Sequence, residues 1–486
     1  MGRLLRLERR RPLVSEVVGS SPTEGGSDAA LIAQSQLSLL FPQLGAPEPI
    51  MELNRTVGPV TFEGAPAAPT TPEQALRRSV MSCLLWEREF YEDGTAIADR
   101  IEILCAKVPH SVIAALAIEA RHKMHLRHVP LLLLATLAKL APGSSLVSDT
   151  IETTVARADE LTELLAIYWR RGKCPLSAQL KKGLAKAFRK FNSYQLAKYN
   201  RPKPIRLRDV MFLVHAKPDA ESESTYRDLA NKTLASPDTW EVALSAGADK
   251  CETFTRLIKA GELGYLALLR NLRNMAEAGV DTELVRNAIV AGKGAHQVLP
   301  FRYVAALRAA PQFANELDYA LQQSIAKLPL LLGTTLVVVD VSGSMNDTLS
   351  QRSDLTRMDA AAALAALING SRLRVFTFSD KVVECAPWRG LAGISEILGS
   401  QHHSGTYLGQ ALATILAATE NQWDRLIVIT DEQSHDRVRH PGRGRCYMIN
   451  VASAKHGVGY GEWLHIDGFS ENVIRYIAEF EAALAR

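Results

Sequence analysis

Two strand-like segments of this sequence each end in an aspartate. The first runs through four apolar residues into an Asp-x-Ser-x-Ser motif, which puts a carboxylate and two hydroxyls on one short turn. A threonine lies in a loop between the two strands. Hard divalent cations such as Mg²⁺ prefer oxygen ligands of these kinds and keep several waters. The sequence therefore predicts a Mg²⁺ or similar divalent site, with the last aspartate bound directly or through water. Its expected ligands are Asp340, Ser342, Ser344, Thr406 and Asp431.

The order of these ligands resembles the metal-ion-dependent adhesion site of von Willebrand factor A domains. Ser404 stands where that motif usually has a glycine, but Thr406 is kept, so the departure barely affects ligation. No Gly-x-Gly-x-x-Gly motif and no Walker lysine loop follows a strand, which excludes a nucleotide-binding interpretation. The alternative is a chance Asp-x-Ser-x-Ser motif in a loop, and the ordered second strand and threonine loop argue against it.

The elements around these ligands predict an α/β domain from about residue 329 to 486. Strand-like runs alternate with Ala- and Leu-rich helical runs, which is typical of a doubly wound parallel sheet. Ligands of such sheets bind at the carboxyl ends of the strands, where both aspartates are expected. The predicted strands are 335–340, 374–378, 425–430 and 446–450, and the predicted helices are 358–368, 408–418 and 473–484.

The preceding residues, 51–328, predict a domain made of helices. Thr71 followed by Pro72 is a typical helix start. Apolar residues then recur at spacings of three and four, with few strand-like runs between them. Successive helices of this kind favour an array of HEAT-type repeats. The helical stretches include 111–124, 129–140, 151–169, 177–188 and 263–278, and residues 1–50, rich in Gly, Ser, Pro and Ala, are expected to be a disordered leader.

Positive charge is concentrated in one segment, residues 170–208. It holds thirteen of the 56 Lys and Arg residues and none of the 52 Asp and Glu residues. A one-signed island of this length favours a polyanion such as nucleic acid over a simple solvated surface, which usually mixes signs. We expect Phe188 and Phe191 to be core residues, whereas Tyr194 and Tyr199 could stack on bases. The candidate RNA contacts are Lys181, Lys182, Lys186, Arg189, Lys190, Lys198, Arg201, Lys203, Arg206 and Arg208.

Composition limits the remaining possibilities. The chain has 486 residues, is 47% hydrophobic and contains six cysteines, none spaced as Cys-x-x-Cys. Its longest apolar run, Val129–Ala138, is too short to span a membrane. The first residues are charged and lack the apolar core of a signal peptide. We expect a cytoplasmic protein, and because no Ser-His-Asp arrangement or Gly-x-Ser-x-Gly motif is present, we expect no catalytic activity.

Four strings of the helical region, followed by the A-type domain, resemble the TROVE family of Ro autoantigens and their bacterial Ro/Rsr relatives. The strings are Ser193–Arg201, Arg206–Pro218, Ala267–Met275 and Gln297–Arg302. The resemblance implies a monomeric ring of helical repeats closed by the A domain. It also implies small noncoding Y RNA on the basic outer face and single-stranded ends of misfolded RNA in the central hole. Bacterial relatives suggest an exoribonuclease partner, polynucleotide phosphorylase.

The resemblance also suggests which residues line the hole. They come from helix ends and from the strings above, although simple surface solvation is an equal alternative for the arginines near residue 270. Leu207 replaces a histidine that is common near the RNA-contacting segment, which affects single contacts but not the basic character. Three histidines between 122 and 128 lack the carboxylate or thiol partners that zinc takes. The candidates are Arg127, His128, Arg270, Asn271, Arg273 and Arg302.

Two functions are therefore open. The first is a noncatalytic RNA-binding scaffold in RNA quality control or decay. The second is a von Willebrand A interaction or co-chaperone module that binds an acidic protein ligand through Mg²⁺. The basic island favours the first, and RNA that copurifies with the protein would separate the two.

Overall fold

The computed structural model describes residues 59–81, 94–298, 301–349, 355–452, 454–468 and 472–484. The chain divides into two units, 1–57 and 58–486, and all described residues belong to the second. The leader expected at 1–50 lies outside the described residues. No helix in the described ranges is long and apolar enough to cross a membrane.

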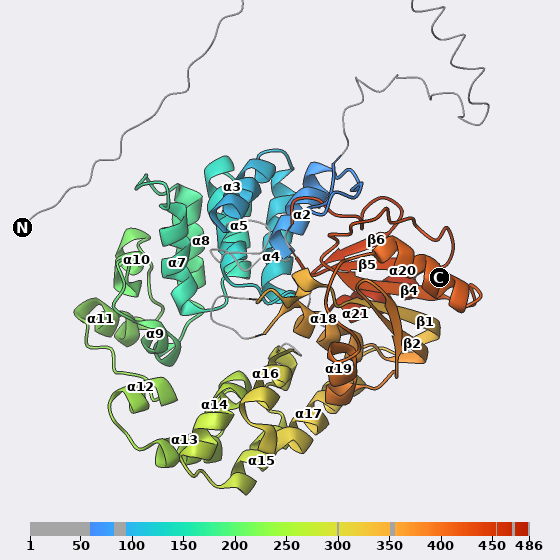
Figure 1. Cartoon of the computed structure of the whole chain (residues 1–486). Coiled ribbons are helices and arrows are strands. Elements are labelled where there is room, and N and C mark those ends of the chain that lie inside the picture. The colour runs from blue at the N-terminus through green and yellow to red at the C-terminus, as the bar shows by residue number, and fades with distance from the viewer. Residues whose placement is uncertain are drawn as a thin grey trace, which may run out of the picture. The chain divides into compact units, whose positions relative to one another are not determined.

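The first part of the described chain is a helical domain, residues 72–326 (Figure 1). Several helices pack both against a neighbour and against the helix two positions away, as α4 does with α5 and α6. This is the contact pattern of stacked helix pairs, and it agrees with the predicted HEAT-type array. The elements are α2 (Pro72–Met81), α3 (Gly94–Cys105), α4 (His110–His122), α5 (His128–Leu140), α6 (Ser145–Thr154), α7 (Ala158–Tyr168), α8 (Ala178–Phe188), α9 (Ser193–Tyr199), α10 (Leu207–Leu213), α11 (Glu223–Asn231), α12 (Trp240–Ser245), α13 (Lys250–Lys259), α14 (Tyr265–Glu277), α15 (Thr282–Ala291), η1 (Ala295–Gln297), α16 (Phe301–Ala309), η2 (Pro311–Phe313) and α17 (Ala314–Ala326).

Local sequence signals set several of these helix boundaries. Thr71 begins α2 as predicted, since its hydroxyl accepts a hydrogen bond from the Gln74 backbone NH at 3.2 Å. The stretch predicted at 151–169 is broken, however, into the end of α6 and the whole of α7. Arg157 is extended there, and the Glu160 carboxylate accepts the backbone NH of Arg157 at 3.1 Å. This carboxylate caps the start of α7, which apolar spacing alone does not reveal.

A six-stranded sheet forms the second domain, residues 331–484. Its order is β3-β2-β1-β4-β5-β6, and only β3 is antiparallel to its neighbour. The predicted strands and helices are present, and β3, β6 and α19 are additions to them. The elements are β1 (Leu331–Asp340), η3 (Gly343–Asn346), α18 (Arg357–Ala366), β2 (Gly370–Phe378), β3 (Val382–Cys385), α19 (Gly390–Leu398), α20 (Leu408–Ala418), β4 (Arg425–Thr430), β5 (Arg445–Asn450), β6 (Leu464–Asp467) and α21 (Asn472–Leu484).

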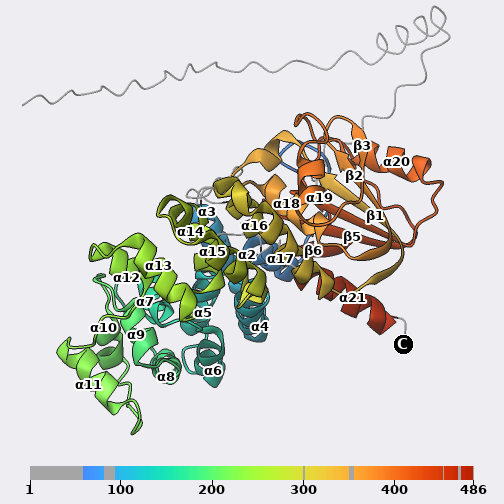
Figure 2. The same ribbon diagram turned by 90° about the horizontal axis from the view of Figure 1, so that it is seen from below.

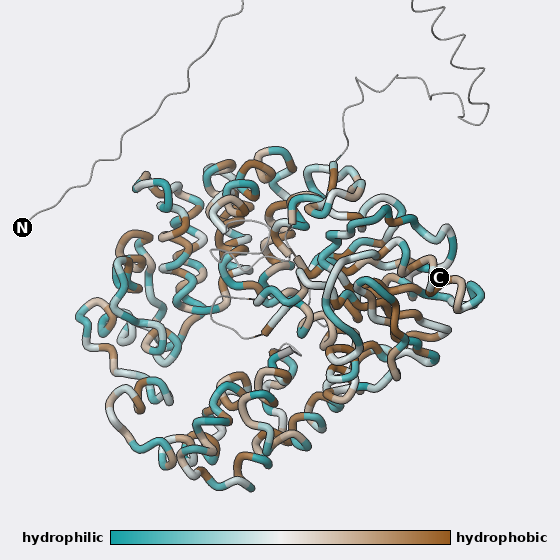
Figure 3. Tube along the Cα trace, viewed as in Figure 1, coloured by the Kyte–Doolittle hydropathy of each residue, from teal (hydrophilic) through white to brown (hydrophobic). Residues whose placement is uncertain are grey.

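Alternate residues of the central strands enter two different cores. Val337 and Val339 of β1 pack with α18, α19 and α21 on one face, whereas Leu336 and Val338 pack with α20 on the other. Both faces of the sheet are therefore apolar, and Figure 3 shows its strands largely in the hydrophobic colour. A sheet covered on both faces exposes only its edges and strand ends, so polar chemistry is confined to those ends.

The helical domain contacts the sheet domain at both ends of the array. At its last helices, Asp359 of α18 forms a two-bond ion pair with Arg308 of α16, and Asp318 of α17 accepts the Leu391 backbone NH. At its first helix, α2 packs against β6. Figure 2 shows α16 and α17 beside α18 and α19. Both the first helix and the last helices of the helical domain therefore contact the sheet domain.

Candidate metal centre and basic surface

Parallel pairing of β1 with β4 brings the two predicted aspartates together. Val339 of β1 lies opposite Ile429 of β4, so Asp340 and Asp431 leave the sheet at the same edge. The hydroxyl of Thr430, between them, donates to Asp340 Oδ2 at 2.6 Å. Both carboxylates are buried, which restricts them to one arrangement.

The two serines of the turn connect these carboxylates. Ser342 donates its backbone NH to Asp340 Oδ1 at 2.9 Å, and its hydroxyl lies 3.4 Å from that of Ser344. The Ser344 hydroxyl donates in turn to Asp431 Oδ2 at 2.6 Å. Four of the five expected ligands therefore form one chain of hydrogen bonds.

The loop that carries Thr406 approaches the same turn. The backbone NH of Gly343 donates to the Ser404 carbonyl at 2.8 Å. A side chain at residue 343 would place its Cβ 3.3 Å from that carbonyl, so glycine allows the close approach. Thr406 is also held by His435, which donates its backbone NH to the Thr406 carbonyl at 2.8 Å. The loop of Thr406 thus lies against the turn that holds Ser342 and Ser344, at the end of the sheet where the two aspartates lie.

The electrostatics of this site suit a cation. Burial and the nearby charge of Asp431 raise the pKa of Asp340 to about 7, against the opposing hydrogen bonds from Ser342 and Thr430. Two adjacent buried carboxylates repel one another, and a bound cation would remove that repulsion. Within the described residues no cluster of three or more His, Cys, Asp or Glu side chains could hold a metal. Three of the five expected ligands are hydroxyls, so such a cluster is not required, and the oxygens present fit Mg²⁺.

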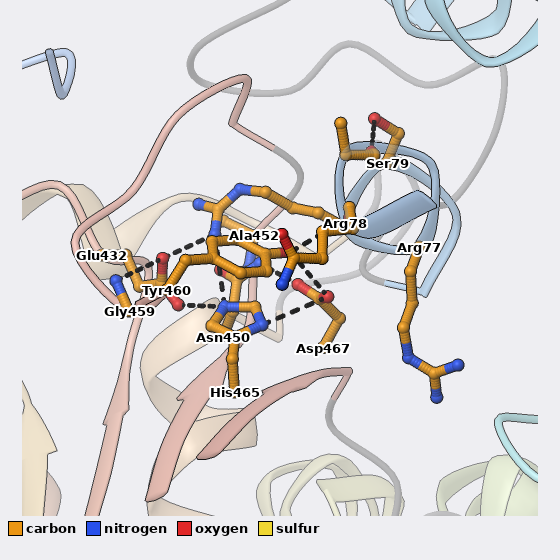
Figure 4. Close-up of polar contacts among 12 residues, drawn as sticks. Arg77, Arg78, Ser79, Glu432, Asn450, Ala452, Gly459, Tyr460, His465 and Asp467 are labelled. Carbon is orange, nitrogen blue, oxygen red and sulfur yellow. Dashed lines mark hydrogen bonds and ion pairs between the residues drawn. The ribbon is translucent and has the colours of Figure 1, made fainter. Parts of the chain in front are cut away.

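A second polar cluster lies directly after Asp431 and was not predicted from the sequence (Figure 4). Arg78 of α2 is buried and donates to Glu432 Oε2 at 2.5 Å and to the Ala454 carbonyl at 2.6 Å. Burial opposes ionisation of Glu432, but the charges of Arg78 and His465 outweigh it and lower its pKa to about 2. This ion pair joins residues 354 positions apart, which no local pattern could reveal.

His465 extends the cluster to the end of β6. Its Nε2 lies 2.5 Å from Glu432 Oε1, and its Nδ1 lies 3.5 Å from Asp467 Oδ2. The ring of Tyr460 stacks on the imidazole with centroids 3.8 Å apart, and its hydroxyl lies 3.3 Å from the same Asp467 oxygen. The cluster therefore fixes α2 against the strand ends of β4 and β6.

Many cations of the basic segment, residues 170–208, have partners inside the protein. Lys186 lies 2.9 Å from Asp149 and from Glu152, and Lys190 donates to the backbone carbonyls of Glu152 and Val155. These contacts were not predicted from the sequence. They tie both lysines to α6 and the residue after it, and leave them less available to a ligand.

Four further cations of the basic segment also have partners inside the protein. Lys203 lies 3.1 Å from Glu163, and Arg208 donates to the Ala230 carbonyl at 2.6 Å while it covers the Phe212 ring. Arg189 likewise donates to the Lys217 carbonyl, and the Lys198 ammonium lies over the Tyr194 ring.

A smaller group of cations stays available. The ion pairs formed among the described residues do not include Lys181, Lys182, Arg201 or Arg206, and all of these but Lys181 are exposed. Phe188 and Phe191 are buried, as predicted, whereas Tyr194 is 45% exposed. The surface that could meet a polyanion is therefore narrower than the whole basic segment.

The six candidates for the hole have different environments. Arg127 pairs with Asp159 at 2.5 Å and with Glu163 at 2.6 Å, and His128 lies 3.6 Å from the same Glu163. Asn271 is buried and donates to the Ala267 carbonyl of its own helix. These contacts are sufficient to explain the three residues structurally.

The arginines of α14 and α16 differ from that group. Arg270 is exposed, and Arg273 lies 3.9 Å from Glu277. Burial, together with the charge of Arg270, lowers the pKa of Arg302, so these two cations lie near one another. The two arginines repel one another, and a nearby anion would relieve that repulsion.

A further group of basic side chains surrounds His125, at the helix end that the resemblance suggests for the lining of the hole. Burial lowers the pKa of His125, and the charges of Arg121, His122 and His296 add to that effect. Residue 296 lies in η1, far along the chain from the α4–α5 loop that holds residue 125. The fold therefore gathers basic side chains from two distant helical segments.

Two family models match this chain. The von Willebrand factor type A domain matches residues 335–433, a range that contains all five expected metal ligands. The TROVE domain matches residues 231–297, which include the string Ala267–Met275. Residues 231–297 are therefore similar to a TROVE domain, and residues 335–433, which follow them, are similar to a von Willebrand factor type A domain. The resemblance drawn from the sequence is thereby confirmed, although the basic segment lies outside the matched ranges.

This chain also has the fold of a solved structure. The crystal structure of Deinococcus radiodurans RO (RSR) protein matches with a TM-score of 0.57 and 16% sequence identity. The match covers 85% of this chain and 100% of that one. At this identity the likeness shows the fold, a helical domain closed by an A-type domain. No curated protein matches the sequence.

Proposed function

We propose that this protein is a noncatalytic RNA-binding scaffold of the Ro type, acting in RNA quality control or decay. The observation that carries the proposal is the exposed remainder of the basic segment on a TROVE-domain protein. Lys182, Arg201 and Arg206 are exposed cations within 25 residues that contain no carboxylate. Phosphates are the ligands that such a surface attracts, and small structured RNA such as Y RNA is the proposed ligand.

A second RNA site is proposed where Arg270 and Arg302 lie close together. These cations could track the phosphates of a single strand. Duplex RNA is about 20 Å across and could not thread a side-chain-lined hole, whereas a free end could. The protein would then select misfolded RNA by its unpaired end.

The second RNA site predicts a preference for RNAs with a single-stranded 3′ tail. Electrophoretic mobility shifts with one duplex, tailed or blunt-ended, measure that preference in the unmodified protein. We expect Arg270→Ala combined with Arg273→Ala to remove it, because both side chains are exposed and their loss leaves the fold intact. A matched control is Arg286→Ala on α15, whose partners are Glu283 and Glu316. Equal affinity for tailed and blunt RNA in the unmodified protein would refute the second site.

The A-type domain is proposed to bind Mg²⁺ through Asp340, Ser342, Ser344, Thr406 and Asp431. A cation held there would supply a positive charge to which a carboxylate of a partner could bind. The buried arrangement of the two aspartates holds the ligands in place, and the Ser344 hydroxyl orients Asp431. An exoribonuclease such as polynucleotide phosphorylase is a candidate partner.

Mg²⁺ should stabilise the protein if this site binds it. A ligand at a hundredfold excess over its dissociation constant adds about 2.7 kcal/mol to the free energy of unfolding. Asp340→Asn should abolish this Mg²⁺-dependent stabilisation in thermal unfolding and leave RNA affinity nearly unchanged. A parallel loss of RNA affinity would show that the two functions are not separate.

The convergence of the five ligands also supports the second function, a module that binds an acidic protein ligand through Mg²⁺. The two functions differ in what accompanies the purified protein. RNA that copurifies, seen as a high ratio of absorbance at 260 nm to that at 280 nm, supports the scaffold. Its absence, together with Mg²⁺-dependent capture of an acidic protein, would support the module.

A further inference from the structure

The loop after Asp431 is held by the N-terminal arm, residues 59–68. The Thr61 hydroxyl donates to the Ser434 carbonyl at 2.9 Å, and the Phe62 backbone NH donates to Gln433 Oε1 at 2.8 Å. Thr61 is buried in this contact. The arm is therefore bonded to the loop by both side chain and backbone.

The other two residues of the loop make contacts of the same kind. Glu63 of the arm lies 3.1 Å from His435 Nε2, and Arg78 of α2 pairs with Glu432. All four residues from 432 to 435 thus bond to the segment 61–78. Four consecutive contacts from one segment indicate a specific docking site for that segment.

The opposite side of this loop contacts the proposed metal ligands. Gln433 donates its backbone NH to Asp431 Oδ1 at 3.1 Å. The Ser434 hydroxyl and the His435 backbone NH both donate to the Thr406 carbonyl, at 3.3 and 2.8 Å. The loop therefore lies between the docked segment and the metal ligands, and a change on one side reaches the other through a single layer of residues.

The backbone of the loop is restrained. Glu432 has a φ of +63°, an unfavourable value for a residue with a side chain. A Cβ added at Gly459 would lie 2.3 Å from the Glu432 carboxylate, so the pocket around it has no spare room. Strained backbone of this kind persists only where surrounding contacts determine it, and here those contacts include Arg78.

We propose that cation binding and docking of residues 59–78 stabilise one another through the loop 432–435. This inference rests on the proposed Mg²⁺ site. A cation would fix Asp431 and Thr406, and with them the loop to which the arm docks. Coupling of this kind is reciprocal, so loss of docking must lower cation affinity by the factor by which the cation favours docking. The affinity of the metal site for its cation would then depend on whether residues 59–78 are docked on the sheet domain.

The test combines two measurements on the full chain. Hydrogen–deuterium exchange follows the Ala68 amide of the arm, which donates to the Gly457 carbonyl of the sheet domain at 3.1 Å. Isothermal titration with Mg²⁺ gives the cation affinity. The variant is Thr61→Val with Glu63→Gln, which removes two arm contacts and leaves the buried Arg78 pair intact. The matched control is Glu73→Gln on α2, which makes the same change at an exposed carboxylate.

We expect Mg²⁺ to slow exchange at Ala68 about fivefold or more, within the usual range of coupling between sites. The arm variant should bind Mg²⁺ more weakly by a similar factor, and the control should not. Ser344→Ala should remove the effect of Mg²⁺ on exchange. Mg²⁺ binding with unchanged exchange, or with equal affinity in the arm variant, would overturn the coupling alone. Failure of the unmodified protein to bind Mg²⁺ would overturn the metal site and the coupling together.

Discussion

Positive charge has opposite roles in two regions of this molecule. At the contact between α2 and the sheet domain, Arg78 is 1% exposed and is fully paired with Glu432 and backbone carbonyls. In the basic segment, Arg201 and Arg206 are exposed and form no ion pair with any described carboxylate. The residue type is the same. Burial decides whether a cation holds the fold together or stays available to a ligand.

The same difference in burial distinguishes two adjacent arginines of α2. Arg77 directly precedes Arg78 in α2. It pairs with Glu119 of α4, and its side chain points away from the buried cluster (Figure 4). Its side chain is 39% exposed. Two adjacent arginines of one helix therefore differ in role: Arg77 forms a partly solvated ion pair, whereas Arg78 forms a buried one that joins the two domains.

The largest effect on the free energy of unfolding is expected from breaking the buried ion pair between Arg78 and Glu432. Arg78→Met leaves the buried Glu432 without its arginine partner and with only His465 beside it, which should lower the free energy of unfolding by roughly 3–5 kcal/mol. Arg77→Met breaks a half-exposed pair and should cost about 1 kcal/mol or less. Denaturant unfolding of both variants measures the difference. Adding Glu432→Gln to Arg78→Met should restore part of the loss, and equal losses at the two arginines would contradict the comparison.

A smaller effect on the free energy of unfolding is expected from a change of pH. Glu432 has its pKa lowered from 4.5 to about 2, so its contribution to stability is complete above pH 4.5 and is lost as the pH falls toward 2. That contribution is on the order of 3 kcal/mol. Glu432→Gln should flatten the stability profile between pH 4.5 and 2, measured by denaturant unfolding at several pH values. The exposed Glu73→Gln variant should keep the original slope, and an unchanged slope in Glu432→Gln would mean that its pKa is not lowered.

The smallest effect per substituted residue is expected for the basic segment, where alanine substitutions should change the salt dependence of RNA affinity. Each phosphate contact contributes about 0.9 or less to the slope of log affinity against log salt concentration. Alanine at Lys181, Lys182, Arg201 and Arg206 should therefore reduce that slope for structured RNA by up to about 3 to 4, with little change in stability. Lys186→Ala with Lys190→Ala should reduce it less, because both lysines are bonded to the protein. An equal reduction per residue in the two sets would show that internal pairing does not limit RNA binding.

The sequence alone determined the metal motif, the alternation of strands and helices and the helical array. These features depend on residues close together in the chain, since a strand or helix pattern is read over a few residues. The buried Phe188 and Phe191 and the cap at Thr71 were predicted on the same basis. The break at Arg157 is also local, but apolar spacing continues through it and conceals it.

Only the tertiary structure decided which charges are satisfied. Lys186 and Lys203 read as free cations in the sequence, yet carboxylates from α6 and α7 pair with them. Arg78 and Glu432 carry no local signal, because a buried ion pair is created by packing between segments distant in the chain. Periodicity describes how each segment folds by itself. The availability of a charge depends on which other segment packs against it, and that is set by the fold as a whole.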